Sequence, residues 1–89
     1  MSLECVKQLH SDLMLVPDNL KAHSIEESDA LIFNTNLAEA NAEHPGDAII
    51  SKLPKANARS TRYHNLLALT GQLKSRLAEL SPKASADFH

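Results

Sequence analysis

Apolar residues recur every three or four positions in three parts of the chain, which is the spacing that lines one face of an α-helix. The first part predicts a short helix over residues 2–16. Its apolar positions are Leu3, Val6, Leu9, Leu13 and Val16. Pro17 should end this helix, because residues that precede a proline avoid the helical region of the backbone.

The second part opens with a capping pattern. Ser24 is followed three positions later by Glu27, which is the spacing of a capping box, and so we expect a helix to begin there. Ala30, Phe33, Leu37 and Ala40 then fall on one face, with Leu31 and Ala38 beside them. Pro45 and Gly46 predict either a break or a sharp kink, and the sequence does not decide between the two.

The third part has the most regular pattern and predicts a long helix that begins at Ser60 or Thr61 and ends at Ser81-Pro82. Its apolar positions are separated by three and four residues in alternation, which is a heptad seam. The seam residues are Tyr63, Leu66, Thr70, Leu73, Leu77 and Leu80. Such a seam can pack inside one chain or between two chains, and the pattern alone leaves both arrangements open.

Between the second and third helices we expect a connector. Asp47 is placed to cap a short helical piece through Ile49, Ile50 and Leu53, which Pro54 would end or bend. The fold class is therefore all-α: a short N-terminal helix and an antiparallel pair of longer helices, as in a helical hairpin or small bundle. We expect residues 1–82 to form a single domain and residues 83–89 to form a disordered tail.

Composition adds an expectation of a homodimer. The chain has 89 residues and only three aromatic ones, so its core must be built from aliphatic side chains. A domain of this size buries only about 60–65% of its unfolded surface, and small leucine-rich helical proteins often complete their cores by oligomerising. We therefore expect the seam residues Leu66, Thr70, Leu73, Leu77 and Leu80 to form the core or the dimer interface.

Charge is divided between the two halves of the chain. Residues 1–47 carry nine acidic and two basic residues, a net charge of −7, and residues 48–89 carry a net charge of +5. The simplest explanation is that the acidic second helix pairs with the basic last helix, within the protein or its dimer. The basic stretch is also the best candidate for a partner-binding surface. Its residues are Lys52, Lys55, Arg59 and Arg62, with Tyr63 as a possible anchor.

Residues that carry chemistry are scattered. The five histidines include no pair at the i,i+4 spacing of a helical zinc site, and Cys5 is the single cysteine. No glycine-rich phosphate loop and no combination of nucleophile and base is recognisable, so we expect no enzyme activity, no cofactor and no metal. A metal or catalytic site around His44 and Asp47 is the weakest hypothesis.

The sequence thus predicts a small non-catalytic regulatory protein that binds another protein through its helical faces, as a homodimer. The partner's identity does not follow from the sequence. The alternative is a DNA- or RNA-binding regulator that uses the basic start of the last helix. A single cysteine, together with the absence of a signal-peptide pattern or a long apolar run, favours the cytoplasm and no membrane partner.

Overall fold

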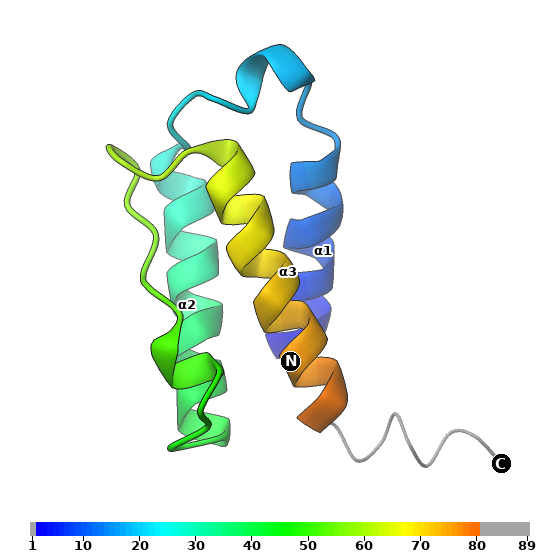
Figure 1. Cartoon of the computed structure of the whole chain (residues 1–89), viewed down its shortest axis with the longest axis vertical. Coiled ribbons are helices and arrows are strands. Elements are labelled where there is room, and N and C mark those ends of the chain that lie inside the picture. The colour runs from blue at the N-terminus through cyan, green and yellow to red at the C-terminus, as the bar shows by residue number, and fades with distance from the viewer. Residues whose placement is uncertain (1, 81–89) are drawn as a thin grey trace, which may run out of the picture.

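The computed structural model describes residues 2–80, which form three α-helices and two single-turn 3₁₀ helices (Figure 1). The elements in order are α1 (Ser2–Met14), η1 (Asp18–Leu20), α2 (Glu27–Glu43), η2 (Ile50–Lys52) and α3 (Tyr63–Leu80). These residues contain no β-strand, so the predicted all-α class is confirmed. The expected disordered tail, residues 83–89, lies outside the described residues.

The three helices form a bundle whose topology differs from the one predicted. α2 and α3 begin at the same end of the molecule and run side by side in the same direction, whereas α1 runs antiparallel to both (Figure 1). Backbone hydrogen bonds join the two starting points, since Ile25 N donates to the Thr61 carbonyl at 2.9 Å. The prediction that α2 and α3 form an antiparallel hairpin is therefore wrong. Residues 44–62 run back along α2 and return the chain to its starting end before α3 begins (Figure 1).

α2 begins two residues later than its capping pattern predicted, because the N-cap is residue 26 and not residue 24. Ser24 forms an isolated antiparallel bridge with Arg62, and the two residues that follow it are not helical, so Ser24 does not cap α2. Glu26 is the N-cap instead, and its backbone N–H donates to Asp29 Oδ2 at 3.4 Å. The same pairing delays α3 to Tyr63, whose backbone N–H donates to the His23 carbonyl at 3.0 Å.

Residues of the predicted seam of α3 lie in the core of the single chain. Leu66, Thr70 and Leu73 are completely buried, Leu77 is buried, and Leu80 packs against the core from a half-buried position. Thr70 satisfies its hydroxyl by donating to the Leu66 carbonyl at 2.7 Å. The other buried apolar side chains come mainly from α1 and α2 and include Val6, Leu9, Leu13, Phe33 and Leu37. The seam therefore packs inside the chain, against α1 and α2, and is not available to a second copy.

The prolines break the helices and do not merely kink them. α2 ends at Glu43, before Pro45, and Gly46 adopts φ +79° in the turn that follows. Glycine suits this left-handed conformation because it has no Cβ. Asp47 holds the turn that leads into η2, since its Oδ2 accepts hydrogen bonds from Ile49 N at 3.1 Å and Ile50 N at 3.0 Å. The N-cap of η2 itself is Ile49.

The returning connector is attached to α2 by one side chain. Asn34 Nδ2 donates to the Ala56 carbonyl at 2.9 Å, and Asn34 Oδ1 accepts from the Ala56 backbone N–H at 2.7 Å. Ala56 is itself buried. The Asn34 side chain thus pairs with the backbone N–H and C=O of Ala56, as an adjacent β-strand would, and holds the extended segment against α2.

Candidate functional site

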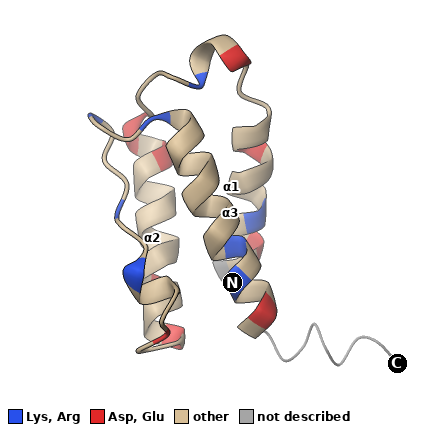
Figure 2. Ribbon diagram, in the orientation of Figure 1, with Lys and Arg blue, Asp and Glu red and all other residues tan. Residues whose placement is uncertain are grey.

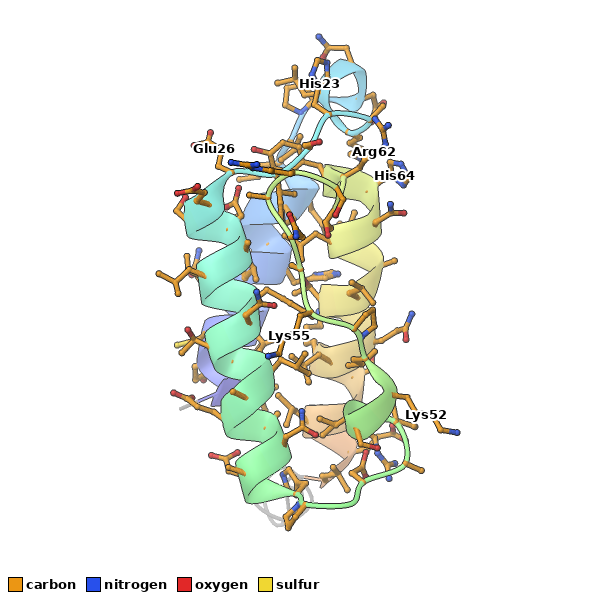
Figure 3. All side chains as sticks on the ribbon, turned by 90° about the vertical axis from the view of Figure 1, so that its left-hand side faces the viewer. His23, Glu26, Lys52, Lys55, Arg62 and His64 are labelled. Atoms are coloured by element: carbon orange, nitrogen blue, oxygen red, sulfur yellow. The ribbon has the colours of Figure 1, made fainter. Side chains whose placement is uncertain are left out.

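The four basic residues predicted as a binding surface do not form a single stripe. Residues 53–62 are extended or in turns, so the helical spacing that would have aligned these side chains does not exist. Lys52 lies at the end of the molecule where α2 finishes, Arg62 lies at the opposite end, and Lys55 lies between them (Figure 3). Lys52, Lys55 and Arg59 are all exposed and are distributed along the whole connector.

Arg62 and Tyr63 contribute to holding the helix ends together. The Arg62 guanidinium donates to the Ala22 carbonyl and so attaches the start of α3 to the segment before α2. Tyr63 is half-buried at the first turn of α3. Burial raises the pKa of its phenol, and the nearby carboxylates of Asp29 and Glu26 raise it further. Both side chains therefore have structural contacts that reduce their availability to a partner.

The most strongly perturbed charged pair joins Asp47 to Arg76. Arg76 Nη2 lies 2.8 Å from Asp47 Oδ1, and Arg76 Nε lies 3.2 and 3.3 Å from the two carboxylate oxygens. The hydrogen bonds from Arg76 and from the Ile50 backbone lower the pKa of Asp47 from 3.8 to about 2. Only 8% of the Asp47 side chain is exposed. Its oxygens are thus already bound by Arg76 and by the turn, which leaves little of the carboxylate for the His44–Asp47 metal site considered from the sequence.

The titration of His10 in α1 is shifted by its surroundings. Burial against the neighbouring helix lowers its pKa, and the positive charge of Lys74 lowers it further. Within residues 2–80, no three His, Cys, Asp or Glu side chains gather as the ligands of a metal ion would.

The surface feature that sequence reasoning missed is an apolar groove between α1 and α2. Exposed apolar side chains line it, and Leu31 and Ile32 of α2 have 67% and 44% of their surface accessible. We name it the α1/α2 groove and define it by eight residues. They are Cys5, Gln8, Leu9, Asp12, Leu31, Ile32, Thr35 and Asn36.

The groove continues along the outer face of α2, which faces away from the core. Five small or apolar residues on this face are exposed and lie three, four, three and four positions apart: Ser28, Leu31, Thr35, Ala38 and Ala42. The exposed Glu39 lies on the same face, beside Thr35 and Ala42. Alternating spacings of three and four are those by which one helix packs along another. A signal for this face was present in the sequence, because Leu31 and Ala38 stand beside the buried positions and not among them.

Acidic residues surround this apolar surface. α2 contains Glu27, Asp29, Glu39 and Glu43 but no lysine or arginine. Figure 2 shows red segments on its ribbon, and the blue segments beside it belong to η2 and the connector. On α1, Asp12 lies in the groove and its Oδ1 accepts a hydrogen bond from Gln8 Nε2 at 3.0 Å. Lys7 stands two positions beyond Cys5, which places it about 200° further around the helix and away from the groove.

A second hollow lies between η2 and α3. Ile49, Ala68, Gly71 and Arg76 line it together with polar side chains. The Arg76 guanidinium is already bound to Asp47, so this charged group of the hollow is less available to bind a ligand. The α1/α2 groove is the more apolar of the two surfaces and the better candidate for an interaction.

No helix within residues 2–80 is long and apolar enough to cross a membrane. None of the protein-family models, curated proteins or solved structures compared with the chain matches it.

Proposed function

We propose that this chain is a small non-catalytic regulatory protein that binds another protein through the α1/α2 groove and the outer face of α2. The observation that carries the proposal is the exposure of Leu31 and Ile32 next to each other on a helix whose inner face is already packed. Two large aliphatic side chains in a groove are an expected site for a helix or loop of a partner.

The proposed binding surface differs from the one predicted from the sequence. Lys52, Lys55 and Arg59 remain exposed on the connector, but they lie outside the α1/α2 groove and do not form a central apolar anchor. Interfaces derive most of their affinity from a few buried side chains near the centre, and the groove supplies such positions at Leu31 and Ile32.

A homodimer stays a prediction, but not one that uses the α3 seam as its interface. Because Leu66, Leu73 and Leu77 are buried within the chain, a dimer would have to use a different surface from the seam. Nucleic-acid binding at the start of α3 remains a prediction that no described contact favours. The backbone N–H groups of Tyr63 and His64 there already donate to the carbonyls of His23 and Lys21.

Affinity capture with three versions of the protein tests this proposal. Wild-type protein, Leu31→Glu and Leu15→Glu are each used as bait in an extract of the cell that makes the protein. Leu15 is a matched control because it is 80% exposed and lies outside the groove. We expect a specific partner with wild type and Leu15→Glu and its loss with Leu31→Glu. Retention of every captured protein by Leu31→Glu would refute the groove as the binding surface.

A further inference from the structure

We infer that the α1/α2 groove takes a basic amphipathic helix, so that the partner presents aliphatic side chains on one face and lysine or arginine beside them. This inference rests on the proposed function and adds the chemistry of the partner. It follows from three features that coincide at the groove. Its lining is largely apolar, its residues have helical spacing, and the charged residues beside it are acidic.

The shape of the surface selects a helix. The groove lies between two antiparallel helices, and its residues on α1 repeat at the spacing of one helix face: Cys5, Gln8 and Asp12. On α2 the exposed small and apolar residues follow the alternating three and four spacing described above. A third helix laid along this groove would pack its aliphatic side chains against Leu31 and Ile32, as helices do in coiled coils and in helix-in-groove complexes.

The charge around the surface selects a basic partner over a second copy of this chain. The exposed charged residues of α2, Glu27, Glu39 and Glu43, are all acidic, and Asp12 adds a further acidic group from α1. Asp29 lies instead beside Tyr63 at the start of α3. Pairing two copies through this face would bring acidic helices together, and like charges across an interface disfavour association. Lysine or arginine beside the partner's apolar stripe would instead complement this rim.

The dimensions of the surface agree with a short helix. α2 has 17 residues, and the small and apolar residues of its outer face extend from Ser28 to Ala42, with Glu39 among them. A helix of about two heptads covers this length. Such a segment is marginal as an isolated helix in water, so we expect the partner segment to become helical when it binds.

Cys5 provides a direct readout, because it is the single cysteine, is exposed and lines the groove. The probe is a synthetic peptide of about two heptads with leucine at the a and d positions and lysine elsewhere. Its counterpart has glutamate in place of every lysine. The rate at which iodoacetamide, a neutral reagent, alkylates Cys5 in the full chain is measured at increasing peptide concentration.

We expect the lysine peptide to slow alkylation of Cys5 in a saturable manner and the glutamate peptide to leave the rate unchanged. Leu31→Ala should weaken protection by the lysine peptide about tenfold, which is the usual effect of truncating an interface anchor. Leu15→Ala should not change it. Asp12→Asn should make protection less sensitive to salt, because charge pairs are screened. Ile32→Ala is a second groove variant, and far-ultraviolet circular dichroism confirms that each variant is folded.

A Cys5→Ser, Ala68→Cys variant controls for non-specific coverage, since residue 68 is exposed on α3 and lies outside the groove. Equal protection at both positions would overturn the inference. Equal or tighter binding of the glutamate peptide would also overturn it. Protection of Cys5 that rises with protein concentration without any peptide would identify a second copy as the occupant and overturn it as well.

The two proposals can fail separately. If neither peptide protects Cys5 but capture of a cellular partner still depends on Leu31, the inferred chemistry of the partner is wrong and the proposed function stands. If neither peptide binds and no captured protein depends on Leu31, both are wrong.

Discussion

Arg76 Nη2 lies 2.8 Å from Asp47 Oδ1, and this ion pair joins the turn after α2 to the last turns of α3. The same Asp47 carboxylate accepts hydrogen bonds from the backbone of Ile49 and Ile50. One side chain thus holds the turn before η2 and attaches it to Arg76 of α3, 29 positions further along the sequence. It also links the acidic half of the chain to the basic half, which is one form of the charge pairing expected from the sequence.

The first prediction concerns the pH dependence of stability. Folding lowers the pKa of Asp47 from 3.8 to about 2, so the folded protein favours the ionised carboxylate. The stabilisation is fully present above the unfolded-state pKa and is lost as the pH falls toward about 2. Urea unfolding at several pH values should show wild type losing its advantage over Asp47→Asn across this range.

The control for this experiment is Asp18→Asn. Asp18 pairs with Lys21 at 3.2 Å but its side chain is 96% exposed. We expect the pH dependence of this variant to follow that of wild type. A stability difference between wild type and Asp47→Asn that stays constant from pH 4 to pH 2 would contradict the role assigned to Arg76.

The second prediction compares two leucines. Leu73→Ala should lower the free energy of unfolding by about 2–5 kcal/mol, because it leaves a cavity at a completely buried position. Leu31→Ala should change it by no more than about 0.5 kcal/mol, since Leu31 is mostly exposed. Chemical denaturation of both variants provides the measurement. Similar losses for the two would mean that α2 buries its outer face.

The third prediction concerns the connector. Asn34→Ala removes both hydrogen bonds to the Ala56 backbone and leaves that buried residue without partners. We expect a loss of about 1–3 kcal/mol in the free energy of unfolding and faster amide hydrogen exchange at Ala56. Asn65→Ala, at an exposed position of α3, is the matched control and should have a small effect. Unchanged exchange at Ala56 in Asn34→Ala would count against the attachment.

The fourth prediction is a stabilisation. A Cβ atom at Gly71 would lie 3.5 Å from His10 Nε2, which is an ordinary van der Waals contact. The close helix approach at this position therefore leaves room for a methyl group. Gly71→Ala should raise the free energy of unfolding by about 0.5–1 kcal/mol, because alanine favours the helix over glycine. A destabilised variant would show that α1 and α3 pack more tightly than these distances indicate.

The helices themselves could be predicted from the sequence because their signals are local. The period of Leu66, Thr70, Leu73 and Leu77 identified the inner face of α3, and Asp47 identified the turn that leads into η2. The direction of α3 relative to α2 could not be predicted in this way. It depends on a connector that runs back along α2, and the contact that holds it joins Asn34 to Ala56, 22 positions apart.

The candidate site was mislocated for a related reason. Lys52, Lys55, Arg59 and Arg62 form a stripe only if residues 52–62 are helical, and Pro54 and the extended pairing of Arg62 with Ser24 prevent this. The groove depends on which face of α2 remains exposed after α1 and α3 have packed. The position of Leu31 beside the buried face was visible in the sequence, but only the tertiary arrangement shows that Leu31 and Ile32 border a groove with α1.

Site-specific photocrosslinking tests the central claim most directly. A benzophenone amino acid replaces Leu31 in one version of the full chain and Ala68, exposed on α3, in another, and both are irradiated inside the cell that makes the protein. Binding through the α1/α2 groove predicts a discrete crosslinked adduct from position 31 and none from position 68. An adduct from position 68 alone, or no adduct from position 31, would contradict it.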